Sequence, residues 1–340
     1  MGPTLPTRFE PDRFRDLFRA AASRRAALAA SGEIEAYRLF GAGEGVDGVF
    51  VDRYGPGVVL AIHESAGLPR AVAPALAFAL LEDVRPQGVR GVYFKSFVRD
   101  RSREVESIGE GASPIAGEAL PHAFLVREYD CRFEVRLGDG WSTGLFLDQR
   151  ENRRALGRLV AERRAAAAGN EARVLNLFAY TCAFAVPLLA AGAHVTNVDV
   201  SPRALDWGRR NVAANALDAT RATFVRMDAM AYLAFARRRG LTFDLVILDP
   251  PTFGAASKRR GVRAWSATRD YAALVQAAAL VVAPGGLTFA STNASALCSD
   301  GVLERLIERA IGRPPAYVAL PRPPTDFARE RGRLVARLFR

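Results

Sequence analysis

The stretch ILDPPTFG, residues 247–254, decides how the rest of the chain is organised. An apolar run ends just before its aspartate, which predicts a buried parallel strand. Pro250 fixes its own φ and favours extended geometry at Asp249, so we expect the strand to end there. Pro251 removes another amide donor and makes the loop stiff. With Phe253 two residues on, such a loop offers an acceptor edge and an aromatic face to a flat base, although a plain Pro-rich connection has the same pattern.

Apolar strands alternate with helical patterns on both sides of this loop, from Arg173 onward. The predicted strands are Val174–Phe178, His194–Asp199, Thr223–Met227, Phe243–Asp249 and Gly286–Ser291. The predicted helices are Tyr180–Ala191, Pro202–Asn215, Ala229–Arg239 and Ala267–Val282. This alternation predicts an α/β fold with a doubly wound, Rossmann-like parallel sheet, and Ala316–Leu320 with Leu334–Phe339 suit a closing antiparallel pair.

A smaller α+β domain is expected before this sheet. We predict a basic amphipathic helix in residues 1–32, a small domain in 33–140 that contacts RNA, and the larger domain in 141–340. In the helix, Phe14 and Phe18 share an apolar stripe with arginines around it. These arginines form either a solvated face of a packing helix or a contact to an RNA backbone.

The bulk composition favours a nucleic-acid partner. The net charge is +11 and the pI is about 10.2, and a basic surface of this size favours an acidic partner. No apolar run reaches the ~18 residues that span a bilayer, and the first residues lack the apolar segment of a secretory signal. Three scattered cysteines indicate neither a zinc site nor a disulfide framework. We therefore expect a cytoplasmic protein without a structural metal.

Acidic residues end three of the predicted strands, where parallel sheets bind their ligands. Asp199 stands where a carboxylate accepts hydrogen bonds from ribose hydroxyls, and Asp228 could accept from an adenine amino group. No GxGxxG follows the first strand, which disfavours NAD. A nucleoside with a cationic tail remains, and S-adenosylmethionine fits this description because its sulfonium suits a rim of carboxylates.

Several motifs, taken in order, carry a family resemblance. They are IEAYRLF (34–40), VDRYG (51–55), TGLFLDQR (143–150), VLNLFAYTCAFAV (174–186), NVDVSPRALDWGRRN (197–211), DPPTFGAASKR (249–259) and PTDFARER (324–331). The chain thereby resembles the bacterial large-subunit (23S) ribosomal RNA base methyltransferases of class I. It looks closest to the guanine nitrogen-7 branch and is similar to the cytosine carbon-5 branch, and we expect it to lack the N-terminal PUA module of the latter.

The resemblance implies roles for residues at the strand ends. The cofactor S-adenosylmethionine would be held by Asn176, Phe178, Ala179, Tyr180, Thr181, Asp199, Ser201, Asp228 and Asp249, with Gln149 and Arg150 closing its methionine end. We predict that Asp249 and the carbonyls of Pro250 and Pro251 orient the target base and that Phe253 stacks on it. Substrate RNA would contact Lys258, Arg259, Arg260 and Arg263. The partner would be ribosomal RNA or a pre-ribosomal particle, and a homodimer is compatible with the sequence.

Three rival interpretations remain open at the level of sequence. The cytosine branch needs a cysteine thiolate just after the fifth strand, where this chain reads ASTN (290–293), although Cys298 lies close by. Methylation of an exocyclic amino group also uses Asp-Pro-Pro followed by an aromatic residue. A non-catalytic RNA-binding protein with a degenerate cofactor site is the third. Cys182 supports it because the family has glycine there, and a left-handed backbone would strain a cysteine.

Overall fold

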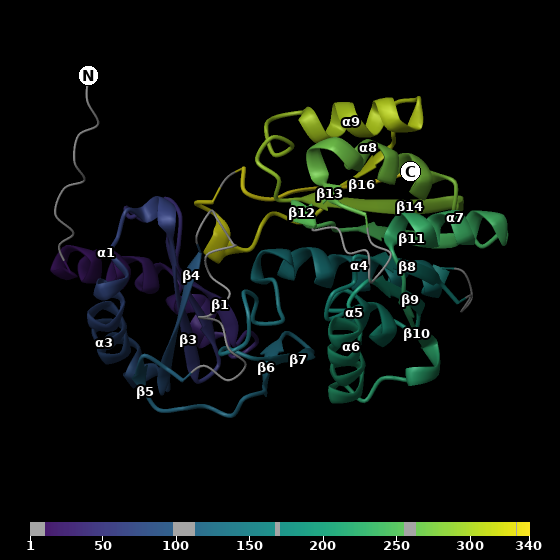
Figure 1. Ribbon diagram of the computed structural model, residues 1–340. Coiled ribbons are helices and arrows are strands. Elements are labelled where there is room, and N and C mark those ends of the chain that lie inside the picture. Colours follow the sequence, from purple (N-terminus) through teal and green to yellow (C-terminus); the bar gives the residue numbers. More distant parts are fainter. Residues whose placement is uncertain (1–10, 98–112, 167–170, 255–262, 331) are drawn as a thin grey trace, which may run out of the picture. The chain divides into compact units, whose positions relative to one another are not determined.

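The computed structural model describes residues 11–97, 113–166, 171–254, 263–330 and 332–340 (Figure 1). The chain forms two compact units. The first unit comprises Met1–Leu147 and Pro324–Glu330, and the second comprises Asp148–Pro323 and Arg331–Arg340. This division differs from the expected one because the N-terminal helix belongs to the first unit, the boundary falls after Leu147, and a short C-terminal segment returns to the first unit.

The second unit contains a seven-stranded sheet in the order β10-β9-β8-β11-β14-β16-β15. Its strands are β8 (Arg173–Leu177), β9 (His194–Asp199), β10 (Ala222–Arg226), β11 (Phe243–Leu248), β14 (Val282–Thr292), β15 (Tyr317–Val318) and β16 (Val335–Phe339). The first five in spatial order are parallel, and β16 is antiparallel to both of its neighbours. The predicted doubly wound α/β sheet with its closing antiparallel pair is confirmed.

Helices cover both faces of this sheet (Figure 1). The helices α4 (Arg150–Ala166), α5 (Ala185–Ala190) and α6 (Pro202–Ala214) share one apolar core with it, and α7 (Ala229–Arg238), α8 (Ala267–Ala279) and α9 (Val302–Ile311) share the other. The first turns of α6 and α7 follow the sequence rules for helix starts. Ser201 and Asp228 are their N-caps, and each accepts a backbone N–H of the first turn.

The predicted helix Tyr180–Ala191 is wrong in its first half, since only Ala185–Ala190 is helical. Residues 178–184 instead form a loop, named here the β8 loop. Phe178, Tyr180 and Cys182 have left-handed φ values of 54°, 47° and 57°. A residue with this φ cannot continue a right-handed helix, so the helix begins only after the third of them.

The first unit is built on a second sheet, in the order β1-β2-β3-β4-β5. Its strands are β1 (Ala36–Phe40), β2 (Val49–Tyr54), β3 (Gly57–His63), β4 (Gly91–Phe97) and β5 (Ala116–Gly117). The helices α1 (Pro11–Arg24) and α3 (Ala73–Val84) share a core with one face of this sheet, α2 (Ala26–Ala30) follows α1, and β6 (Phe124–Glu128) and β7 (Cys131–Val135) form a hairpin.

The arginines of α1 face acidic residues of the same unit. Phe14 and Phe18 are 1% exposed, as the apolar stripe predicted. Arg15 and Arg19 both donate to Asp83 of α3, with shortest distances of 2.8 Å. These internal ion pairs favour the packing-helix interpretation over an RNA contact for this part of the helix surface.

A segment from the far end of the chain completes the first unit. We call Pro324–Glu330 the strap. The backbone N–H of Arg38 donates to Asp326 Oδ2 at 2.9 Å, and the Arg38 guanidinium bridges Asp52 and Glu330 at 2.7 Å each. Burial opposes ionisation of Arg38, but the two carboxylates raise its pKa. The guanidinium also lies 4.5 Å from the ring centroid of Phe327, so ion pairs and packing together hold the strap.

Within the described part of the chain, no helix is long and apolar enough to cross a membrane. The same residues contain no group of three or more His, Cys, Asp or Glu side chains arranged to hold a metal ion.

Candidate functional site

Asp249 follows β11 at the carboxyl edge of the second unit's sheet. Its Oδ1 accepts hydrogen bonds from Ser291 Oγ at 2.6 Å and from Gln149 Nε2 at 3.1 Å. Burial raises the pKa of Asp249 to about 6, against the lowering effect of the Ser291 hydroxyl. Neither hydrogen bond uses Oδ2, so this second oxygen keeps its capacity to accept a proton donor from a ligand.

Gln149 links Asp249 to helix α4. Its side chain is 2% exposed, and its Oε1 accepts from Asn152 Nδ2 at 2.7 Å. Its Nε2 also donates to Ser291 at 3.1 Å. Because both ends of the amide are engaged, its orientation is fixed and it presents a donor to Asp249. Arg150, the next residue and the first of α4, is 1% exposed, and its Nε lies 3.4 Å from Glu151 Oε1.

The loop after Asp249 is held by a tryptophan. The Pro251 carbonyl accepts from Trp265 Nε1 at 2.8 Å, so one of the two carbonyls predicted to face a base already has a donor. Pro250 is buried. Phe253 is 70% exposed and lies on β12 (Phe253–Gly254), which pairs with β13 (Trp265–Ser266). An exposed phenylalanine on a short, fixed ribbon is free to stack on a planar ligand.

Trp265 also contacts the β8 loop. Its ring centroid is 5.2 Å from that of Phe178, with an angle of 52° between the planes. One side chain therefore joins the loops that follow the neighbouring strands β8 and β11.

Asp199 ends β9 with its carboxylate oriented by backbone amides. Tyr180 N donates to Oδ2 at 2.9 Å and Ser201 N donates to Oδ1 at 2.8 Å. Burial raises the pKa of Asp199, and the amide hydrogen bonds work in the opposite direction. Each oxygen of a carboxylate can accept a second hydrogen bond, so the group can still receive a pair of hydroxyls.

Asp228 lies beyond the end of β10, one strand further along the sheet. Its Oδ1 accepts from Ala231 N at 3.1 Å as the cap of α7. The backbone of the preceding residue, Met227, donates to the Asp199 carbonyl at 3.1 Å. The predicted acids at the ends of β9 and β10 therefore lie on adjacent strands.

Two predicted cofactor residues, Asn176 and Thr181, are buried and make structural hydrogen bonds. Asn176 is 2% exposed and donates to Asn197 Oδ1 at 2.9 Å within the sheet. Thr181 is 1% exposed, and its carbonyl accepts from Asn211 Nδ2 at 2.9 Å. The first contact joins the end of β8 to β9, and the second holds the β8 loop against α6. Ala179 contributes through its backbone, which donates to the Val198 carbonyl at 3.0 Å.

Cys182 has the left-handed backbone that normally belongs to glycine, but its thiol points into the core. Its Sγ is 3.7 Å from the Tyr180 carbonyl. It also packs on Gly208 of α6, where an added Cβ would lie 2.4 Å from the sulfur. Burial raises the pKa of Cys182. The thiol therefore fills a niche against α6 that the glycine in that helix provides.

Ser291, rather than a cysteine, occupies the end of the fifth parallel strand beside Asp249. Cys298 lies on the following segment, where its Sγ is 3.4 Å from the Thr292 carbonyl. Burial raises the pKa of the Cys298 thiol, which lowers the fraction present as the nucleophilic thiolate.

The predicted RNA-contacting residues are described only in part. Lys258, Arg259 and Arg260 lie outside the described residues, and Arg263 is exposed next to β13.

Ser291 and Trp265 are the contributors that sequence reasoning missed. In ASTN (290–293) the pattern concerns the missing cysteine, and nothing local marks Ser291 as a hydrogen-bond donor to Asp249. A tryptophan 14 residues after Pro251 carries no local signal for the contact with that carbonyl.

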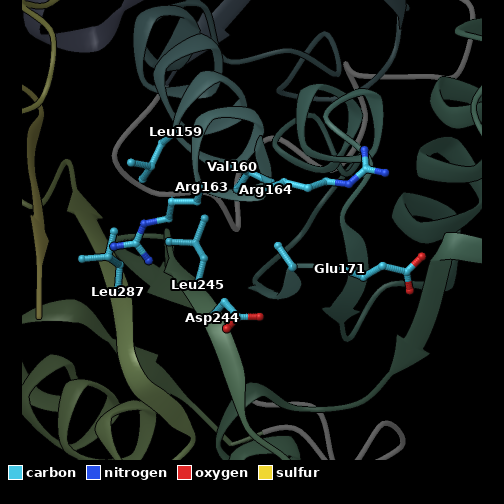
Figure 2. A pocket seen from close by; sticks show the side chains of 9 residues that line it. Leu159, Val160, Arg163, Arg164, Glu171, Asp244, Leu245 and Leu287 are labelled. Carbon is cyan, nitrogen blue, oxygen red and sulfur yellow. The ribbon is translucent and has the colours of Figure 1, made fainter. Parts of the chain in front are cut away.

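A separate cavity of about 220 Å³ lies at the amino ends of the strands (Figure 2). Figure 2 shows Arg163 and Arg164 of α4 on its wall, with Asp244 near the start of β11. Glu171, also on the wall, already pairs with His194 at 2.7 Å and Arg221 at 2.8 Å. Because Asp249 follows the opposite end of β11, this cavity is distinct from the strand-end site.

A family model described as S-adenosylmethionine-dependent methyltransferase matches residues 99–327 of the chain. Ribosomal RNA large subunit methyltransferase I from Klebsiella pneumoniae is 34% identical over 290 residues, which cover 84% of this chain and 67% of that protein. Its counterpart from Cronobacter sakazakii is 35% identical over 288 residues, covering 83% and 67%.

Solved structures show the same likeness. One described as a methyltransferase complexed with S-adenosylhomocysteine (SAH) superposes with a TM-score of 0.80 at 30% identity, covering 98% of this chain and 82% of the other. An S-adenosylmethionine-dependent methyltransferase from Agrobacterium tumefaciens shares the fold, with a TM-score of 0.61 at 20% identity and coverage of 91% and 89%.

Proposed function

Because the chain belongs to the family of S-adenosylmethionine-dependent methyltransferases, we propose that it methylates a base of large-subunit ribosomal RNA, with guanine nitrogen 7 as the target atom. On this proposal it works in the cytoplasm on free ribosomal RNA or a pre-ribosomal particle. The names of its relatives support the RNA class, and the choice of atom rests on the chemistry around Asp249.

The residues at the strand ends fit the cofactor. Asp199 is oriented by two amides and keeps lone pairs for the ribose hydroxyls. The half-buried Asp228 stands on the next strand, where it can accept from the adenine amino group. Because the Cys182 thiol packs on Gly208, it faces away from any ligand beyond the strand tips. When bound, the cofactor supplies a methyl group activated by a positively charged sulfur.

The observation that carries the choice of guanine nitrogen 7 is the neighbourhood of Asp249. Ser291 stands beside it and donates a hydrogen bond, whereas the Cys298 thiol is directed at a backbone carbonyl. Carbon 5 of cytosine becomes nucleophilic only after a thiolate has added to the ring. Nitrogen 7 of guanine carries an in-plane lone pair and needs no such helper. Positioning by Asp249 and stacking on Phe253 are then sufficient roles for the protein.

Methylation of an exocyclic amino group is the second candidate. It is favoured by Asp249 Oδ2, which takes part in neither the Gln149 nor the Ser291 hydrogen bond and could accept an amino proton. A base with a pKa of about 6 is suited to receive that proton near neutral pH.

Nucleoside analysis tests the proposal. Ribosomal RNA from a strain lacking the gene is methylated in vitro with the purified protein, digested and examined by mass spectrometry. We expect 7-methylguanosine in the wild-type reaction and its loss from the deletion strain. An N-methylated exocyclic amine would favour the second candidate, and 5-methylcytidine that disappears in Cys298→Ser would restore the thiolate mechanism. If every base mark survives the deletion, the RNA substrate is wrong.

A further inference from the structure

The first unit's sheet has two unlike faces. One face packs against α1 and α3 through an apolar core that contains Val49, Val51 and Leu60. Because side chains alternate along a strand, their neighbours point to the other face. On that face Phe50 of β2 and Ala61 of β3 form a small separate cluster with Phe97 of β4.

Four rings follow one another across this second face, and we call them the aromatic row. Phe50 meets His63 edge-on at 5.0 Å, and His63 stacks on Phe97 at 4.7 Å with 15° between the planes. Phe97 meets Trp141 at 5.1 Å. The ladder of β3 and β4 brings His63 and Phe97 side by side. The register of the sheet therefore fixes the central pair of the row, His63 and Phe97.

Lys95 holds the outer end of the row. Its Nζ donates to the carbonyls of Asp139 and Gly140 at 2.8 and 3.0 Å. This lysine is 6% exposed, and it lies two residues before Phe97 on the same face of β4. The two hydrogen bonds fasten the turn that precedes Trp141 and keep the indole next to Phe97.

The opposite end is held by Arg38. Its guanidinium lies 4.8 Å from the centroid of Phe50, between that ring and Phe327 of the strap. The row therefore has one fixed end at the strap and another at the turn before Trp141. Three members of the row, His63, Phe97 and Trp141, are each partly exposed, whereas Phe50 is 5% exposed.

We propose that the aromatic row is a stacking platform for unpaired nucleotides of the substrate RNA. Partly exposed aromatic side chains such as His63, Phe97 and Trp141 can stack on the bases of single-stranded RNA, because every base has a π face. The chain's charge of +11 favours a polyanion over a neutral partner.

This inference rests on the proposed RNA substrate, and it assigns the aromatic row as the place where an unpaired strand of that RNA binds. The test compares Trp141→Leu and Phe97→Leu, which keep apolar bulk but remove a π face, with Trp141→Phe, which keeps one. Phe78→Leu is the matched control, because Phe78 is 58% exposed on α3, the helix that packs on the sheet's other face. Fluorescence anisotropy measures binding of a single-stranded ribosomal RNA fragment and of a duplex of the same composition.

We expect each leucine variant of the row to bind the single strand roughly tenfold more weakly, the range that loss of one stacked base gives. Trp141→Phe and Phe78→Leu should bind as the wild type does, and SAH affinity by calorimetry should be unchanged in all four. Wild-type RNA affinity in both leucine variants would overturn the proposal and leave the row a packing feature. An equal loss in Trp141→Phe would overturn it as well, because stacking would not be the cause.

A second measurement covers the case in which a leucine variant does not fold. The chain has three tryptophans, so the double variant Trp207→Phe/Trp265→Phe reports on Trp141 alone. Single-stranded RNA should quench its emission on binding, and binding without quenching would contradict the proposal. Nucleoside analysis keeps the two proposals apart. Product without any effect of the row variants on RNA affinity refutes the row alone, and weakened RNA binding without 7-methylguanosine refutes only the target atom.

Discussion

The loops that follow β8 and β11 start side by side, since Leu177 and Leu248 are paired in the sheet, yet they become rigid by opposite means. The β8 loop curls through three left-handed residues that carry side chains, and this turns the Tyr180 amide toward Asp199. Among residues 249–254 after β11, all of them described, none is left-handed, and this loop relies on two prolines. The β8 loop thus presents the Tyr180 N–H as a donor, whereas the two prolines contribute no backbone N–H beside the Asp249 carboxylate. The difference matches a cofactor held by its hydroxyls and a base held by its edge.

Removing the acceptor from the proline loop should have the largest effect. Asp249→Ala leaves Gln149 Nε2 and Ser291 Oγ without their acceptor and abolishes the oxygen that would orient the base. We expect kcat/KM for methyl transfer to fall by about 100-fold or more, as when a preorganised polar group is lost from an active site. Single-turnover methylation measures this, with SAH calorimetry as the control for the β8 loop. Activity above a tenth of wild type would contradict the assigned role.

Lowering the pH should reduce methyl transfer by protonating Asp249 in the proline loop. Because burial raises the pKa of Asp249 to about 6, kcat/KM should fall about tenfold per pH unit below that value if the carboxylate form is needed. The contribution of Asp249 to the free energy of unfolding changes with pH in the opposite direction. The folded state binds this proton more tightly than the unfolded chain, so the contribution is present below the ordinary pKa and is lost as pH rises through about 6. A pH profile that keeps its acid limb in Asp249→Asn would assign the limb to another group.

Substituting Trp265, which contacts both the β8 loop and the proline loop, should show how far the two loops depend on each other. Trp265→Ala loses the hydrogen bond to Pro251 and the contact with Phe178. A hydrogen bond and an aromatic pair of about 1 kcal/mol each predict a decrease in kcat/KM of up to about 30-fold. Trp265→Phe keeps the ring contact and should recover part of the loss. Identical kinetics in the two variants would mean that the ring contact with Phe178 has no role, and wild-type kinetics in Trp265→Phe would mean the same of the indole N–H.

The smallest effect concerns the stability of the β8 loop. At φ 57°, Cys182→Gly should be more stable than Cys182→Ala by about 1 kcal/mol, the opposite of the usual order, because only glycine adopts this backbone without cost. Gly208→Ala should destabilise the wild type by crowding the sulfur, and should be tolerated in the Cys182→Gly background. Urea unfolding of the four variants measures both differences. Additive effects of the two substitutions would show that thiol and helix do not compete for space.

The sequence was most informative where local pattern and fold agree. The strand His194–Asp199 is predicted with the bounds that the structure has, because an apolar strand bounded by turn residues leaves little choice. The β8 loop was mistaken for helix because its left-handed positions hold Phe, Tyr and Cys rather than the glycines that mark such a turn. The amphipathic helix α9 was not assigned, although its apolar residues recur at helical spacing.

The site shows the same limit. Asp249 and Asp199 could be found because an acid at the end of a buried strand is a local pattern. The partners that orient them could not, since Ser291 is 42 residues from Asp249 and reaches it only through the pairing of β11 with β14. The strap was missed for a similar reason, because the hydrogen bond between Arg38 and Asp326 joins positions 288 residues apart.

The strap also bears on how this molecule is made. Arg38 and Arg25 are synthesised early, but the Asp326 groups that they contact emerge from the ribosome only when the chain is nearly complete. Domains usually mature from the N-terminus during translation. Here the earlier unit has to wait for the later one, because the Arg38 backbone N–H and the Arg25 guanidinium each lack one acceptor until Asp326 has been made. An expression fragment cut after Leu147 would carry that unfinished state permanently, so the two halves of this protein are poor subjects for separate study.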